Sequence, residues 1–115
     1  MSLATLGPDA ALSNLAMDAL GDQTRRTILS LLQARPTPVG VLARQLPISR
    51  PAVSKHLRIL EKAGLVAHTS KGASNIFYLR HEGFAAARAY LDSFWDEALA
   101  RYQQLAELYA EVADE

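Results

Sequence analysis

The sequence predicts a mainly α-helical domain that contains one small β-hairpin and ends in a long helix. Over most of the chain, apolar residues recur at helical spacing, and glycine or proline interrupts them at short intervals. Between residues 65 and 80 the pattern changes, because a polar segment separates two runs of strand-forming residues. Helical spacing then returns from about residue 82 and continues to about residue 113.

Composition limits the class of protein. The chain has 115 residues, half of them hydrophobic, which fits one folded domain over residues 9–115 after a flexible segment of residues 1–8. The apolar runs are far shorter than the ~20 residues that a membrane helix needs, and we read no secretory signal. We therefore expect a cytoplasmic protein with no membrane partner. The chain has no cysteine, which excludes disulfides and thiolate metal ligands.

Three helices are expected before residue 48. The first carries apolar residues from Leu12 to Leu20 and closes at Gly21. The second is capped by Asp22 and stops before Pro36. For the third, Thr37 is expected to be the cap and Pro38 a first-turn residue, and Pro47 ends it.

The fourth helix, at about 49–63, is the most informative element. Ser49 can cap it, and Val53, Leu57 and Leu60 form one narrow apolar stripe. Only Pro47 and Ile48 are expected to separate it from the third helix. Two short helices joined by so short a turn must cross steeply, as in a helix-turn-helix.

A wing and a terminal helix complete the domain. Residues 65–80 predict a hairpin with a polar tip over Ser70–Ser74, and residues 82–113 predict a single helix. Steps of three and four separate the apolar residues of that helix, and Arg101 is the only interruption, so we expect a helix–helix interface. The sequence thus predicts a winged helix-turn-helix with a long C-terminal dimerisation helix. The expected dimer residues are Leu15, Phe84, Leu91, Phe94, Trp95, Ala98, Leu105 and Leu108.

Charge is segregated although the net charge is zero. Residues 25–88 hold eleven Arg or Lys residues against Glu61 and Glu82, whereas the two ends hold Arg101 against ten acids. A basic middle segment between acidic ends is typical of a nucleic-acid-binding face on a solvated scaffold. On the fourth helix, cations lie opposite the apolar stripe, where they can contact phosphates or guanine. The expected DNA-binding residues are Ser49, Arg50, Ser54, Lys55, His56, Arg58, Lys62 and Lys71.

Several of these residues have alternative roles. Ser49 is explained by its role as a helix cap, and Lys71 can simply be a solvent-exposed residue of the turn. Arg25, Arg26 and Arg44 can either contact the DNA backbone or lie in solvent on the surfaces of their helices. His56 lies at the edge of the apolar arc, where it can pack or contact a phosphate.

The segments Leu20–Leu29, Ser49–Val66 and Lys71–Leu79 resemble the ArsR-type (ArsR/SmtB) family of bacterial winged-helix regulators. The string VSKHLRILEKAGLV is the most specific part. The resemblance implies a homodimer whose terminal helices pair with the first helices and which binds operator dyads in double-stranded DNA. It also implies that Ser49, Arg50, Ser54, Lys55 and His56 face the groove and that Lys71 lies on the wing.

The chain departs from that family in its sensor sites. The family's arsenic and cadmium sites are built from cysteines, which are absent, and no histidine follows His81 to form a zinc site on the terminal helix. Asp92, Asp96 and Glu97 cluster at near-helical spacing, but exposed carboxylates of this kind bind divalent ions only weakly. Ala73 stands on the wing where many relatives have arginine. We expect no metal site and no cofactor, in a subgroup that lacks metal ligands.

The leading hypothesis is a homodimeric repressor that binds a pseudo-palindromic operator and does not sense metal. One alternative is a winged-helix protein-interaction module, and another is a repressor that responds to an unidentified small ligand. An enzyme is not expected, because the three histidines lie on different elements with no accompanying nucleophile or phosphate loop.

Overall fold

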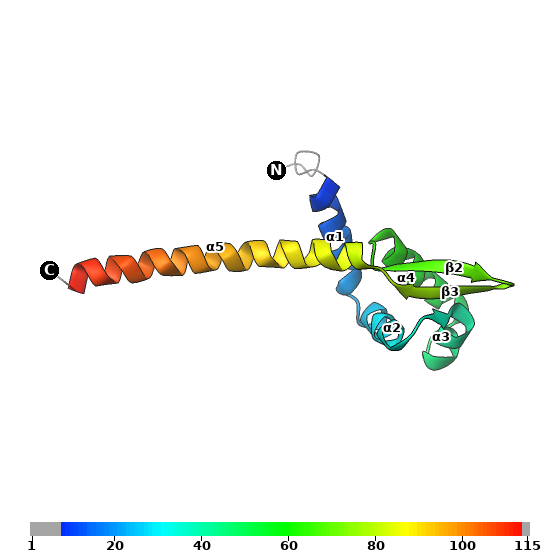
Figure 1. The fold of residues 1–115 in the computed structure, drawn as a ribbon. Helices are drawn as coiled ribbons and strands as arrows, with labels where there is room; N and C mark the ends of the chain where they lie inside the picture. Colours follow the sequence, from blue (N-terminus) through cyan, green and yellow to red (C-terminus); the bar gives the residue numbers. More distant parts are fainter. Residues whose placement is uncertain (1–7, 114–115) are drawn as a thin grey trace.

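The computed structural model describes residues 8–113 and confirms the predicted fold class. The elements are α1 (Pro8–Leu20), α2 (Gln23–Ala34), β1 (Thr37–Pro38), α3 (Val39–Gln45), α4 (Arg50–Lys62), β2 (Val66–Lys71), β3 (Ser74–Leu79) and α5 (His81–Ala113). The molecule measures 75 × 30 × 21 Å, because most of α5 projects away from the other elements (Figure 1). Residues 1–7 of the expected flexible segment lie outside the described residues, whereas Pro8 already belongs to α1.

The core lies where α1 to α4 meet the base of the hairpin. Its largest side chains are fully buried and come from four elements and the turn after α4: Ile28, Leu42, Val53, Leu57, Leu60, Leu65 and Val66. The three apolar positions predicted for the fourth helix are all buried. In α2, Ile28, Leu29 and Leu32 are buried, whereas Leu31 is only half-buried at the edge of the core.

A third strand corrects the expected start of the third helix. Thr37 and Pro38 form β1, which pairs antiparallel with β3 through Thr37–Phe77 and Pro38–Ile76, and the sheet order is β1-β3-β2. Thr37 therefore caps no helix, and α3 begins at Val39 without a side-chain cap. The physical reason is that a residue before proline is disfavoured in the helical region.

The turn between α3 and α4 is longer than expected. It spans residues 46–49, because Leu46 leaves the helix with extended backbone angles. Leu46 also precedes a proline, so the same restriction that extends Thr37 ends α3 one residue early, at Gln45. The two helices still cross within a short connection, which confirms the helix-turn-helix.

The wing has a shorter tip than the sequence suggested. β2 continues through Lys71 and β3 starts at Ser74, so only Gly72 and Ala73 form the turn. Gly72 has a φ of +62°, a left-handed conformation that glycine adopts without strain. Ser70, which was expected to lie in the tip, is paired across the strands with Asn75.

Among the described helices, none is both long enough and apolar enough to cross a membrane.

Candidate nucleic-acid interface

Helix α4 is fixed at its start by its own sequence. The hydroxyl of Ser49 accepts a hydrogen bond from the backbone N–H of Ala52 at 3.3 Å, and Pro51 occupies the first turn, where its missing N–H costs nothing. Val53, Leu57 and Leu60 are buried against the core. Because these residues fix one side of the helix, the opposite side faces outward.

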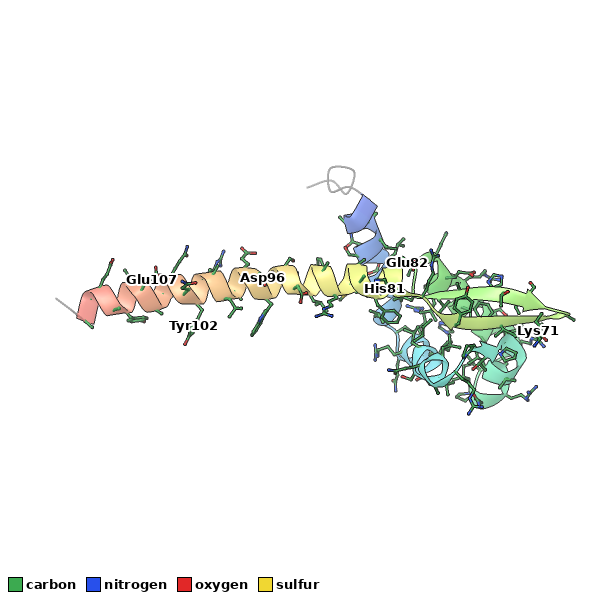
Figure 2. All side chains as sticks on the ribbon, in the orientation of Figure 1. Lys71, His81, Glu82, Asp96, Tyr102 and Glu107 are labelled. Atoms are coloured by element: carbon green, nitrogen blue, oxygen red, sulfur yellow. The ribbon has the colours of Figure 1, made fainter. Side chains whose placement is uncertain are left out.

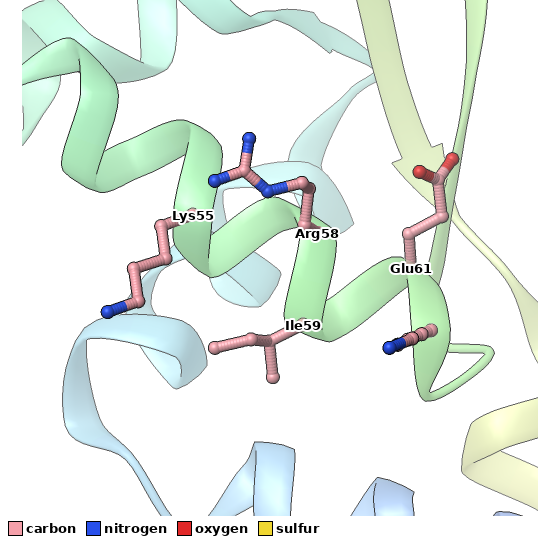
Figure 3. Close-up of a pocket in the computed structure, with 5 residues that line it drawn as sticks. Lys55, Arg58, Ile59 and Glu61 are labelled. Carbon is pink, nitrogen blue, oxygen red and sulfur yellow. The ribbon is translucent and has the colours of Figure 1, made fainter.

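The outward side of α4 carries four exposed cations: Arg50, Lys55, Arg58 and Lys62. Among the described residues, no carboxylate lies within ion-pair distance of any of them. Glu61 is the only acid on this helix, and its carboxylate is taken up by Nδ1 of His68 on β2, 2.5 Å away. Figure 3 shows Glu61 on the side of the strands and Lys55 on the opposite side of the helix. The positive charge of this face is therefore not neutralised locally.

The surface beside these cations is hollowed. A groove of about 540 Å³ is lined by Lys55, Arg58, Ile59, Glu61 and Lys62 (Figure 3). A smaller hollow of about 240 Å³ lies between α4 and the sheet, and Ser54, Arg58, His68 and Asn75 are among its lining residues. Ser54 is half-buried, so its hydroxyl lies at the base of the face and the longer cations extend beyond it.

Two further basic positions extend the face. Lys71 lies at the tip of the wing, at the end of the domain away from α5 (Figure 2). On α3, a Cβ built at Gly40 would lie 3.7 Å from Nη1 of Arg50 and 4.0 Å from Nη1 of Arg44. The guanidinium groups of Arg44 and Arg50 therefore converge over α3, a pairing that sequence spacing alone did not indicate.

His56 differs from the other expected DNA-binding residues. Its side chain is only 23% exposed, with Nδ1 3.9 Å from a carboxylate oxygen of Asp22 and 3.5 Å from Nη1 of Arg25. The structure thus turns His56 toward the start of α2, whereas the family resemblance implied a groove-facing side chain. Its position links α4 to α2.

Arg25 and Arg26 serve the scaffold. The guanidinium of Arg25 donates to the carbonyl oxygens of Ala19 at 2.8 Å and Asp18 at 3.2 Å, and Arg26 donates to that of Leu20 at 2.8 Å. These carbonyls belong to the last turn of α1, where cations are favourable, and that of Asp18 also accepts a hydrogen bond from the backbone N–H of Gly21 at 3.1 Å. The two residues therefore cap α1, a third role beside the two that the sequence left open.

Asp22 caps α2 as expected. Its carboxylate accepts a hydrogen bond from the backbone N–H of Arg25 at 2.9 Å. That bond, with smaller contributions from the charges of Arg25 and His56, holds the pKa of Asp22 below its usual value of 3.8 against the opposing effect of desolvation.

The expected dimer residues fall into two groups. Phe84 is half-buried and packs against the protomer's own core, as Ala87 does, so the first turns of α5 are already covered. The remaining residues are exposed: Leu15, Leu91, Phe94, Trp95, Ala98, Leu105 and Leu108. The free part of the apolar seam therefore starts at Leu91.

Metal ligands do not gather in the part of the chain that the structure describes: no group of three or more His, Cys, Asp or Glu residues could hold an ion there. Two acids of α5 lie beside bases, since Asp92 is 3.8 Å from Arg88 and Glu97 is 3.6 Å from Arg101. Both pairs are exposed, so they contribute little to stability.

A helix-turn-helix with a three-stranded wing and a cationic outward helix defines the class as a winged helix-turn-helix DNA-binding domain. Residues 22–68 match the family described as "Bacterial regulatory protein, arsR family". The chain belongs to the ArsR family of transcriptional regulators, and it is not an enzyme.

Named relatives and solved structures agree with this assignment. The chain is 49% identical over 90 residues to the HTH-type transcriptional regulator Rv2034 of Mycobacterium tuberculosis, covering 78% of this chain and 84% of that one. It is 39% identical over 59 residues to the transcriptional repressor SdpR of Bacillus subtilis (51% and 66% covered). It is 33% identical over 78 residues to the transcriptional activator HlyU of Vibrio cholerae (68% and 71%).

Two solved structures show the same architecture. An ArsR-like transcriptional regulator from Rhodococcus sp. RHA1 superposes with a TM-score of 0.72 at 31% identity, covering 93% of this chain and 97% of that one. The homodimeric winged helix-turn-helix DNA-binding domain of Mb0332 from Mycobacterium bovis superposes with a TM-score of 0.60 at 25% identity, covering 79% and 84%.

Proposed function

We propose that this regulator is a homodimer that binds a pseudo-palindromic operator with two copies of α4 and represses transcription. The observation that carries the proposal is the cationic face of α4. Glu61 is the only acid on this helix, and its carboxylate contacts His68 rather than the cations. In this class of domain the start of the recognition helix approaches base edges, and the residues further along contact phosphates. Ser49, Arg50, Ser54 and Lys55 would then lie nearest the bases, and Arg58, Lys62 and Lys71 nearest the phosphates.

Dimer formation is supported by the exposed apolar seam of α5, which no described element of the same protomer covers. Leu91, Phe94, Leu105 and Leu108 are each 54–57% exposed, and Leu15 of α1 is 45% exposed. An apolar surface of this size on a soluble domain is typical of an interface. A hollow of about 600 Å³ between α1 and α5 offers space for side chains of a partner helix. The homodimeric state of the Mycobacterium bovis neighbour supports the same assembly.

We propose repression because an operator-bound dimer of this size acts most simply by covering DNA that the transcription machinery needs. The relatives include both a repressor and an activator, so the sign of regulation needs its own assay. With the operator placed over a promoter in vitro, transcript should fall as the protein is added. An increase would reverse the assignment.

We also propose that regulation does not use metal. The chain has no cysteine for a thiolate site, and two acids of α5, Asp92 and Glu97, lie in exposed pairs with arginines. A small ligand is the alternative effector, and a mostly apolar hollow of about 370 Å³ beside Leu29, Leu79 and Phe84 is a place to look for it.

The test of the operator proposal is selection of bound genomic fragments, repeated with and without a panel of divalent metals. A small set of fragments with a shared dyad should be recovered in both arms. Binding should weaken steeply with salt, with a log–log slope of about −5 to −8 if six to nine phosphates are contacted. Recovery of unrelated fragments with a flat salt response would contradict DNA recognition, and a metal-dependent set would contradict metal-free regulation.

A further inference from the structure

The distal half of α5 carries a second apolar surface beside the seam. Trp95, Tyr102 and Tyr109 are seven residues apart, and they are 64%, 74% and 74% exposed. Leu99, Ala106 and Ala113 fill the positions between or after them at steps of four. We call these six residues the aromatic stripe. A repeat of seven places all of them on one side of the helix.

The aromatic stripe is centred on a different side of the helix from the seam, although it includes Trp95, which the sequence placed among the dimer residues. At 100° per residue, the stripe is centred roughly 90° around the helix axis from the seam of Leu91, Phe94, Leu105 and Leu108. Together the two surfaces cover about half of the helix circumference. One partner helix in a two-stranded coiled coil covers mainly the narrower seam, whereas a helix in a larger bundle carries apolar residues at a third heptad position as well.

Three acids of the distal half, Asp96, Glu107 and Glu111, lie away from both surfaces, whereas Glu97 borders the seam. Figure 2 shows Asp96 and Glu107 on the side of the helix opposite Tyr102. The negative charge on this side of the distal half of α5 disfavours nucleic acid as its binding partner. The aromatic stripe carries no charge, which favours the apolar face of another helix as its partner.

No described element of the same protomer covers the stripe. Figure 1 shows α1 crossing α5 near its start, and the distal half extends beyond it. The 33 residues of α5 span about 50 Å, so the distal half reaches well past the globular part.

We propose that the aromatic stripe joins two of the proposed dimers into a tetramer, with α5 of a second dimer as its occupant. The proposal rests on the dimer described above. The stripe is self-complementary because every copy presents the same seven-residue spacing, as an interface between identical dimers requires. An aromatic side chain buries about 150–250 Å². Each chain contributes three aromatic side chains that are 64–74% exposed, so four chains together would bury on the order of 1,200–2,000 Å². This is the size of a stable interface.

Sedimentation equilibrium of the full chain between 1 and 100 μM tests the proposal. The wild-type protein should reach about 50 kDa, four times the 12.5 kDa of one chain. Tyr102→Glu/Tyr109→Glu should sediment at about 25 kDa. Both tyrosines are largely exposed in the protomer, so these changes should leave the fold intact, which circular dichroism checks. Tyr102→Phe/Tyr109→Phe should remain tetrameric.

The matched control adds two acids to the opposite side, as Ala100→Glu/Gln104→Glu, and should remain a tetramer. The single tryptophan, Trp95, gives an independent readout, because its emission should shift to the red when the stripe becomes exposed in the tyrosine-to-glutamate variant. A wild-type protein of 25 kDa throughout the range would overturn the tetramer and leave the dimer standing. A mass of 12.5 kDa would overturn both. A tetramer that survives Tyr102→Glu/Tyr109→Glu would show that the stripe is not the interface.

Discussion

The backbone N–H of Gly83 donates a hydrogen bond to the carbonyl oxygen of Gly64 over 2.8 Å. This contact joins the first turn of α5 to the turn that follows α4. Gly64 has a φ of +71°, which ends α4 and directs the chain into β2. The proposed dimerisation helix is therefore attached directly to the end of the recognition helix. A change in the angle between two α5 helices would alter the spacing of the two α4 helices.

Gly83→Ala should destabilise the domain by about 3 kcal/mol. A Cβ at this position would lie 2.3 Å from the carbonyl oxygen of Ala63 and 2.7 Å from the carbonyl carbon of Gly64, both backbone atoms that no rotamer change can relieve. Urea denaturation measures the loss. Gly40→Ala is the control, because its Cβ would meet nothing closer than 3.7 Å, and stability should stay the same or rise by up to about 1 kcal/mol. Equal stability of the two variants would refute the close approach.

Asp22 should make the domain sensitive to acid. Its folded-state pKa lies below the unfolded value of 3.8, so its contribution to stability is complete above that value and is lost as the pH falls through the folded pKa. Asp22→Asn retains an acceptor for the α2 cap without a titrating group. Urea midpoints from pH 6 to pH 2.5 should show wild type falling more steeply than the variant below about pH 4. Parallel curves would indicate that this carboxylate is not coupled to folding.

Substitutions at Ser49 separate the capping role from the DNA-binding role. Ser49→Asp should keep the stability of the domain, since aspartate caps helices as well as serine does, but its charge should repel phosphates and weaken operator binding at least about tenfold. Ser49→Ala should lose about 1 kcal/mol of stability, with a smaller effect on binding. Thermal denaturation and fluorescence anisotropy measure the two properties. If Ser49→Asp bound DNA as wild type does, Ser49 would lie outside the interface.

Leu91→Asp/Leu105→Asp should convert the protein to a folded monomer. Both leucines are 54% exposed in the protomer, so replacing them should change the stability of the single chain little. In a dimer, each protomer would bury two carboxylates in the interface, which would prevent association. Ala100→Asp, on the other side of α5, is the control. Sedimentation at 12.5 kDa is the expected result for the double variant. A stable dimer would move the interface away from this seam.

The elements were largely predictable from the sequence because the signals that set them are local. Ser49 and Asp22 cap the helices they were expected to cap, and Val53, Leu57 and Leu60 are buried as their spacing predicts. β1 was missed because two residues are too few to show a periodic pattern, and because the pairing of Thr37 with Phe77 joins residues forty positions apart. The expected two-residue turn was wrong because the restriction on Leu46 by Pro47 ends α3 early.

The candidate site was less predictable, since its details arise from contacts between elements. A helical wheel places His56 near the cations of α4, but the approach of α2 turns it toward Asp22 and Arg25. The pair of Glu61 and His68, which leaves the cations of α4 without a carboxylate, joins a helix to a strand and has no sequence signature. Phe84 follows the heptad of the seam, yet the close approach at Gly83 places it against the core.

The central claim is that the cations of α4 bind DNA phosphates, and the salt dependence of operator binding tests it most directly. Lys55→Ala/Arg58→Ala removes four cations per proposed dimer, so the log–log slope should become shallower by about three to four, with affinity lost at low salt. Arg88→Ala, which removes an 85% exposed base from α5, should keep the wild-type slope. If the double variant kept both the slope and the affinity of the wild type, α4 would not be the DNA-binding helix.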